Sequence, residues 1–297
     1  MTEIVRCGRD PVYFTNNYAK ISEPMRGLIP FELYDFQKDA LSHFTEHRFS
    51  VILKARQLGI STTVAAYVCW LMLFQREKNV LVVATKLSTA TNLVKKIKSI
   101  HKHLPPWLKI ADININNRTS FELTNGSQVK ASSTSGDAGR SEALSLLVVD
   151  EAAFVEGMDE LWAGLYPTLS TGGRCIALST PNGVGNWFHK TYTEAIESKN
   201  DFFTIKLPWS VHPERDERWF KKETRNMAAR EIAQELECNF NASGDTVVSG
   251  DDIKRLLDFC SEPGHRTGFD RNYWIWKPVE EGTEYLLCAD VARGDGL

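Results

Sequence analysis

Two short segments of this chain combine residue types that bind and activate phosphate groups. The first is Lys54–Thr62, KARQLGIST, which contains two cations, a glycine and two hydroxyls. A loop that opens a helix binds anions through its backbone N–H groups and the positive end of the helix dipole. The usual phosphate loop has its lysine directly after the second glycine, where Ile60 stands here. The segment therefore indicates either a phosphate site served by Lys54 or a plain basic turn.

The second segment, Leu146–Glu151, is an apolar run that ends in two carboxylates. Asp150 is suited to hold a hydrated Mg²⁺, and Glu151 to orient and deprotonate an attacking water. A buried strand that ends in an acidic turn is common, so this segment alone is not specific. The two segments together, in this order, are much more specific than either one.

Two further segments fit the same chemistry. Arg174–Gly183, RCIALSTPNG, ends its apolar run in the hydroxyls of Ser179 and Thr180, which could sense a γ-phosphate. The alternative is a strand and an ordinary turn, because proline and Asn-Gly are turn residues anyway. The pair Phe36-Gln37 could stack on and read an adenine base, although a lone glutamine is usually solvated.

The elements expected around these segments alternate between strands and helices. Strands are expected at 50–53, 79–84, 144–150 and 174–179, helices at 62–74 and 87–103, and a hairpin at 121–131 with its turn at Asn125-Gly126. This rhythm predicts an α/β fold, a parallel sheet covered by helices on both faces, with ligands at the carboxyl ends of the strands. After Pro181 the chain becomes polar and charged. Helices are expected at 227–237 and 251–259, a loop at 261–272 and a new strand at 284–290.

Composition excludes several classes of protein. The chain has 297 residues, 42% hydrophobic and 25% charged, which excludes a mainly disordered, collagen-like or coiled-coil chain. Its net charge of −3 argues against a wholly basic nucleic-acid binder but leaves room for a local basic patch. The longest apolar run, Val64–Phe74, is too short to span a bilayer, and the N-terminus has no secretion signal. The six cysteines are scattered, so we expect reduced thiols and a cytoplasmic protein.

The order of the motifs resembles the large terminase subunit of tailed bacteriophages, the ATPase that packages DNA. The matching segments are 33–37, 54–62, 148–151 and 178–183. The resemblance implies a P-loop NTPase of the additional-strand, catalytic-glutamate type with a small, mostly helical subdomain. The domains it implies are an N-terminal extension at 1–30, an ATPase core at 31–205, a charged helical lid at 206–260, a linker at 261–283, and the truncated first strand of an RNase-H-like nuclease domain at 284–297.

The resemblance also implies roles for single residues, with ATP and Mg²⁺ as cofactors. Nucleotide binding falls to Gln37, Lys54, Gln57, Gly59, Ser61, Thr62, Ser179 and Thr180, and Mg²⁺ binding to Ser61 and Asp150. Glu151 is the expected catalytic base, and Arg56 or Arg140 the expected arginine finger. Asp290 resembles the first metal ligand of the nuclease, but one carboxylate pair cannot build that site, so we expect no DNA cleavage.

The partners expected from the resemblance are double-stranded DNA, the portal protein and the small terminase subunit. DNA would be held by its phosphates without sequence preference, through the lysine-rich segment 95–102 or the segment 215–230, either of which could instead be a solvated helix face. A homo-oligomeric ring, or a monomer in isolation, in the host cytoplasm and away from membranes is expected. Two alternative functions are a helicase-like DNA-dependent ATPase and a nucleotide-binding scaffold without turnover.

Overall fold

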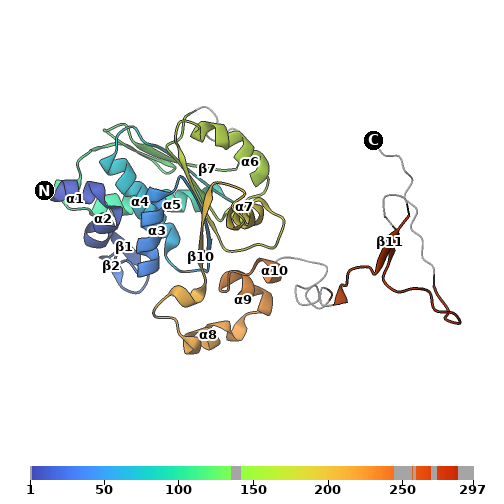
Figure 1. The fold of residues 1–297 in the computed structure, drawn as a ribbon. Helices are drawn as coiled ribbons and strands as arrows, with labels where there is room; N and C mark the ends of the chain where they lie inside the picture. The colour runs from blue at the N-terminus through green and yellow to red at the C-terminus, as the bar shows by residue number, and fades with distance from the viewer. Residues whose placement is uncertain (1, 135–141, 244–255, 257–258, 269–272, 287–297) are drawn as a thin grey trace. The chain divides into compact units, whose positions relative to one another are not determined.

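The computed structural model describes residues 2–134, 142–243, 256, 259–268 and 273–286 (Figure 1). The chain divides into two units, Met1–Val247 and Val248–Leu297, and each is described here by itself.

The first unit is built on one eight-stranded sheet. Its strand order is β10 (Phe202–Leu207), β3 (Phe49–Lys54), β9 (Arg174–Ser179), β8 (Leu146–Asp150), β4 (Asn79–Ala84), β7 (Gln128–Ser132), β6 (Ser120–Leu123) and β5 (Ile113–Asn116). The strands from β10 to β7 are parallel, whereas β6 and β5 pair antiparallel. The parallel core strands are apolar runs buried on both faces, as such sheets require.

The sheet confirms the predicted α/β fold and refines it. β9 lies between β3 and β8, which is the additional strand that the resemblance implied. The predicted hairpin is β6–β7, with Gly126 in its turn at a φ of +82°. The predicted hairpin forms an antiparallel edge of the otherwise parallel sheet, and β5, which was not predicted, extends that edge.

Helices cover both faces of this sheet (Figure 1). On one face lie α2 (Pro11–Tyr18), α3 (Asp35–Glu46), α4 (Ile60–Phe74) and α5 (Leu87–His103), and on the other α6 (Met158–Leu165) and α7 (Trp187–Ile196). The helix α4 packs against α2, α3 and α5, so nearly all of its side chains are buried. Short 3₁₀ turns lie at Pro106–Leu108, Ala152–Phe154 and Tyr166–Leu169. None of the helices in the described ranges has the length and apolarity needed to cross a membrane.

The segment 2–30 was expected to be an extension before the ATPase core, and it packs onto that core. It forms α1 (Glu3–Arg9), α2 and a hairpin of β1 (Lys20–Glu23) and β2 (Gly27–Pro30). Asp10 caps α2 by accepting hydrogen bonds from two backbone N–H groups. The indole of Trp70 in α4 donates a hydrogen bond of 2.9 Å to the carbonyl of Cys7, and Phe14 is fully buried. The segment is therefore part of the hydrophobic core.

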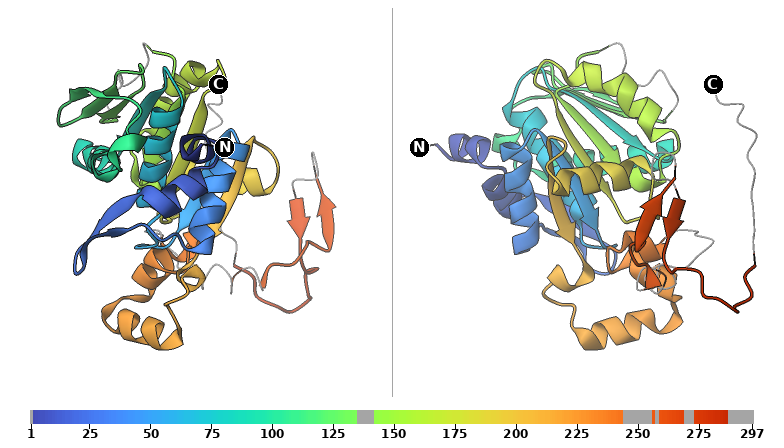
Figure 2. Two further views of the ribbon diagram at one scale, coloured as in Figure 1. Left: turned by 90° about the vertical axis from the view of Figure 1, so that its left-hand side faces the viewer. Right: turned by 45° about the vertical axis from the view of Figure 1, so that its right-hand side comes forward.

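The charged segment 209–243, which we call the lid, follows β10 and is helical as predicted (orange in Figure 2). It contains the 3₁₀ turns Trp209–Val211 and Thr224–Asn226 and the helices α8 (Glu217–Glu223), α9 (Ala229–Glu235) and α10 (Phe240–Ser243). The helix predicted at 227–237 is the shorter α9, because the Glu231 carboxylate accepts a hydrogen bond from the Ala228 N–H and starts the helix there. The lid boundary predicted at residue 206 falls inside β10.

The second unit contains a small antiparallel pair of strands, β11 (His265–Thr267) and β12 (Tyr273–Ile275). The segment 261–272 was expected to be a loop, but it contains the strand β11. The glycines and proline around this short strand are typical of a loop, which is why the sequence did not indicate it. Glu284–Leu286 belongs to no strand, and the remainder of the strand expected at 284–290 lies outside the described residues. The same holds for most of the helix expected at 251–259. Of the described cysteines, Cys260 is exposed and the others are buried, and all are free thiols.

Candidate active site

The predicted phosphate loop leaves β3 at Lys54 and enters α4 at Ile60, as expected from the sequence. Gly59 has a φ of +73°, and a Cβ atom there would lie 2.7 Å from the Gln37 amide nitrogen, so only glycine fits. Ile60 is 1% exposed and belongs to the hydrophobic core. The position of the usual phosphate-loop lysine is thus occupied by a core residue, which leaves Lys54 as the cation that enters from the strand.

Gln37, in α3, holds the phosphate loop by a hydrogen bond. Its amide nitrogen donates a hydrogen bond of 2.9 Å to the carbonyl of Leu58, and its amide oxygen accepts one of 3.1 Å from the N–H of Tyr34. The side chain is buried. These contacts assign Gln37 a bracing role that sequence reasoning missed, while its contact with adenine stays a prediction.

Ser61 and Asp150 meet at the carboxyl ends of β3 and β8. The Ser61 hydroxyl donates a hydrogen bond of 3.4 Å to the Asp150 carboxylate, which is buried. Mg²⁺ is held by one or two hard oxygen ligands and keeps most of its waters, and this donor pair fits that requirement. Burial raises the pKa of Asp150, and the charge of Lys54 opposes that rise. Burial likewise lowers the pKa of Lys54, against the charges of Asp150 and Glu151.

Glu151 occupies an unusual backbone conformation directly after β8. Its φ is +56°, in the left-handed region that non-glycine residues rarely adopt. Its own N–H donates a hydrogen bond of 3.0 Å to Asp150, and its exposed carboxylate accepts one of 3.3 Å from the hydroxyl of Thr85. Strained conformations of this kind cluster at functional sites. Thr85, directly after β4, is a site residue that no motif in the sequence indicates.

The end of β9 is bonded to the turn that follows Glu151. Ser179 and Thr180 are both buried, and the Ser179 hydroxyl accepts a hydrogen bond of 3.2 Å from the N–H of Ala153. The Asn182 amide donates another, of 3.2 Å, to the carbonyl of Ala153. The end of β9 is therefore hydrogen-bonded to Ala153, two residues after Glu151.

The lid is tied to the phosphate loop by two charged side chains. Arg56 forms an ion pair with Glu235 of α9, and its N–H donates a hydrogen bond of 2.8 Å to the Glu235 carbonyl. Arg215 donates hydrogen bonds of 3.2 and 2.9 Å to the carbonyls of Arg56 and Gln57. Its guanidinium also lies 4.5 Å from the centre of the Trp219 ring. The lid contacts thus engage the carbonyls of Arg56 and Gln57 and the N–H of Arg56.

The remaining predicted site residues have different outcomes. The hydroxyl of Thr62 accepts a hydrogen bond of 3.1 Å from Lys96, which belongs to the lysine-rich segment 95–102 that was expected to contact DNA or to be a solvated helix face. Gln57 is exposed and, like Glu151, has a positive φ, of +58°. Arg140 and Asp290 lie outside the described residues.

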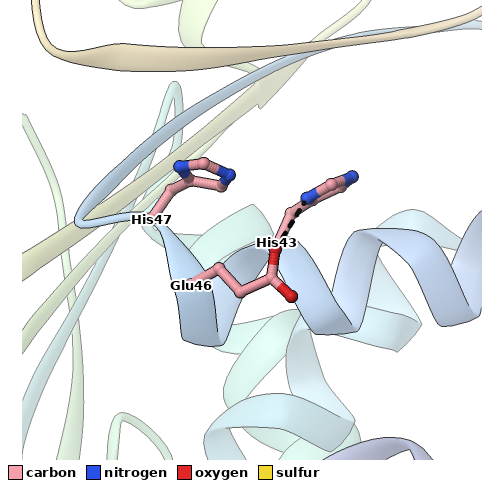
Figure 3. A group of neighbouring side chains, drawn as sticks. All are labelled: His43, Glu46 and His47. Atoms are coloured by element: carbon pink, nitrogen blue, oxygen red, sulfur yellow. Dashed lines mark ion pairs between the residues drawn. The ribbon is translucent and has the colours of Figure 1, made fainter.

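A separate group of side chains could hold a metal ion. His43, Glu46 and His47, near the end of α3, have ligand atoms within 4.8 Å of one another (Figure 3). His43 pairs with Glu46 at 3.5 Å, and the His47 ring stacks on Phe203 at 3.9 Å. Two imidazoles suit transition metals better than Mg²⁺. The oxygen pair Ser61 and Asp150 is therefore the better Mg²⁺ site.

Comparisons with known proteins agree with this geometry. A family model described as the T4-like-virus type of terminase large subunit, N-terminal region, matches residues 51–255. The probable terminase large subunit gp28 of Escherichia phage Mu is 29% identical over 124 residues, which cover 35% of this chain and 22% of that relative.

Solved structures of phage large terminases share the fold. The ATPase domain from Thermus phage P74-26 has a TM-score of 0.58 at 19% identity, covering 71% of this chain and 94% of that one. The large terminase of bacteriophage HK97 has a TM-score of 0.64 at 16% identity, covering 90% and 60%. The large terminase of a thermophilic bacteriophage, in complex with ADP, has a TM-score of 0.55 at 13% identity, covering 69% and 52%.

Proposed function

Because the chain belongs to the T4-like type of terminase large subunits, we propose that it hydrolyses ATP to drive double-stranded DNA into a phage procapsid. Among the described residues, the observation that carries this proposal is the meeting of the phosphate loop with Ser61, Asp150 and Glu151 at one edge of the sheet. The ADP complex of the thermophilic phage terminase supports a nucleotide at this edge.

Each side chain at this edge has a chemical task. Lys54 and the loop N–H groups bind the phosphates, and Ser61 and Asp150 would hold a Mg²⁺ ion, which would supply charge neutralisation at the phosphate oxygens. Glu151 takes a proton from the attacking water, and the Thr85 hydroxyl orients its carboxylate. The hydrogen bond from Ala153 to Ser179 carries the change at Glu151 to β9, and the Arg56 and Arg215 contacts carry a change in the loop to the lid.

DNA contact is supported by the basic surface of α5. No acidic residue occurs from Lys78 to Ala111, a stretch that contains seven lysines in a chain of net charge −3. Hollows of about 690 and 360 Å³ along this surface share Lys95 and Lys98. We call the lysines at 95, 98 and 102 of α5, together with Lys109 after the following 3₁₀ turn, the α5 basic face. Lysines spaced along a helix can follow a phosphate backbone without reading sequence.

The other partners are proposed from the family of the chain and not from any contact in the structure. Portal protein, small terminase subunit and a ring of identical subunits in the host cytoplasm belong to the proposal. The Arg140 segment acts across the ring in this scheme, whereas Arg56 is paired with the lid of its own subunit.

The test is Mg²⁺-dependent ATP hydrolysis by the wild type and by Glu151→Gln, with and without duplex DNA. We expect Glu151→Gln to lower kcat by about 10²- to 10⁴-fold, the usual value of a general base, and to leave ATP binding intact. Equal hydrolysis by both proteins would refute the motor function and favour a nucleotide-binding scaffold.

DNA stimulation tests the α5 basic face separately. We expect Lys95→Ala combined with Lys102→Ala to weaken DNA binding and flatten its salt dependence. Lys190→Ala, an exposed lysine on α7, is the matched control. If the double variant binds DNA as tightly as the control does, α5 does not contact DNA.

A further inference from the structure

Lys96 of α5 is a cation that the mechanism above does not use. Its amine donates a hydrogen bond of 3.1 Å to the hydroxyl of Thr62, at the start of α4. It belongs to a different element from Lys54, which enters the site from β3. Two lysines of separate origin therefore approach the phosphate loop.

The packing of α5 on α4 places Lys96 there. Leu93, Ile97 and Ile100 are buried at helical spacing and fix the inner face of α5. Lys96 precedes Ile97, at the margin of that face. It lines a cavity of about 560 Å³ together with Ser61, Thr62 and Asp150, so the amine lies in the same hollow as the Mg²⁺ ligands.

The charge of Lys96 has no ionic partner within the described part of the chain. Its hydrogen-bond acceptor is a neutral hydroxyl, and the charge of Asp150 favours its protonated form. Lys96 is exposed at the open side of the cavity, and the protein packed around its amine, together with the nearby Lys54, lowers its pKa. A partly desolvated cation beside a second cation gains from an anion placed between them.

We propose that Lys96 is a second phosphate-binding residue, which contacts the β- and γ-phosphates of ATP from the α5 side of the loop. The proposal rests on the function proposed above. In the usual phosphate loop the lysine after the glycine reaches these phosphates, and here that position is the buried Ile60. Ser61 and Asp150, the residues that would hold Mg²⁺, line the same cavity as Lys96.

The consequence is that the missing loop lysine is replaced by a pair. Lys54 approaches the phosphates along the strand, and Lys96 from a neighbouring helix. Because α5 also presents the basic face proposed to hold DNA, one helix then contacts both the nucleotide and the DNA. Lys96 binds the phosphates of ATP, and the α5 basic face binds those of DNA.

The experiment measures the affinities of fluorescent ATP and ADP analogues with Mg²⁺ and without DNA. The variants are Lys96→Met, which keeps the apolar stem, Lys96→Arg, which keeps the charge, and the control Lys190→Met. We expect Lys96→Met to weaken ATP binding about tenfold, as for loss of a charged hydrogen bond, and ADP binding less. Lys96→Arg should stay within about threefold of the wild type.

Each outcome decides a different statement. If the wild type binds no nucleotide, the proposed function fails. If the wild type binds and hydrolyses ATP but Lys96→Met matches Lys190→Met, the role of Lys96 alone is overturned. Equal losses for ATP and ADP would overturn the γ-phosphate contact. Thermal unfolding of each variant verifies the fold, and Lys96→Gln replaces Lys96→Met if the latter unfolds.

Discussion

The carboxyl edge of the sheet and the lid hold their functional residues by different means. At the sheet edge, Ser61, Asp150 and Ser179 are attached to strands and a helix buried in one hydrophobic core. In the lid, Arg215 reaches the phosphate loop from the turn before α8, and Glu235 reaches it from α9; both helices are short and have few buried side chains.

We therefore expect the sheet edge to carry out catalysis and the lid to modulate it. Residues fixed by a packed core keep the sub-ångström geometry that catalysis needs, because such a core resists deformation. Partly exposed polar contacts, such as the Arg56–Glu235 pair, contribute little energy and exchange easily. We therefore expect substitutions at the sheet edge to cost orders of magnitude in rate, and substitutions in the lid to cost factors of a few.

After Glu151→Gln, the largest effect expected at the sheet edge is that of Lys54→Ala. It removes the cation that enters the loop from β3, and loss of one preorganised charged donor costs about 10²- to 10³-fold in kcat. Steady-state ATP hydrolysis with saturating Mg²⁺ measures this loss.

The matched comparison is Arg56→Ala. The side chain of Arg56 is 64% exposed and pairs with Glu235 of the lid. A Lys54→Ala enzyme within a few-fold of the wild type would show that loop N–H groups, Arg56 and Lys96 suffice. It would also remove the contrast between the two regions.

The pH dependence sharpens the comparison, because the shifted groups Asp150 and Lys54 lie at the sheet edge. Asp150 must be ionised, and its raised pKa makes kcat/KM fall at a higher pH on the acid side than an ordinary aspartate would. Lys54 must be protonated, and its lowered pKa makes the rate fall on the alkaline side below the range of an ordinary lysine. We expect about a tenfold loss per pH unit beyond either limit. A profile as broad as that of unshifted groups would contradict the burial of this pair.

The smallest effect expected is that of Arg215→Ala in the lid. It removes two hydrogen bonds to loop carbonyls on a partly exposed surface, and contacts of this class are worth about two- to fivefold. We expect the change in KM for ATP, with kcat nearly unchanged. Arg218→Ala, an exposed arginine in the neighbouring α8, is the control. A loss in kcat as large as that of Lys54→Ala would place the lid within the catalytic machinery.

The sheet and the central motifs could be predicted from the sequence because both are local. Strands β3, β4 and β9 are short apolar runs next to turn residues, and Lys54–Thr62 and Asp150-Glu151 are contiguous. The hairpin at Asn125-Gly126 is a strong local signal for the same reason.

What sequence reasoning missed are contacts between residues far apart in the chain. Thr85 beside Glu151, Gln37 beneath Leu58 and Lys96 on Thr62 depend on how whole elements pack. The lid contacts of Arg215 depend on loop paths that no periodicity encodes. β5 alternates isoleucine with asparagine over only four residues, all of them exposed, in a segment rich in asparagine that also resembles a loop.

The left-handed backbone at Glu151 has a consequence for the history of this protein. Selection for stability alone would favour glycine or asparagine at a φ of +56°, because those residues adopt it at little cost. A glutamate there lowers the stability of the whole domain in exchange for one well-aimed carboxylate. Under the function proposed above, a substitution of Glu151 by glycine or asparagine would give a more stable protein that no longer hydrolyses ATP.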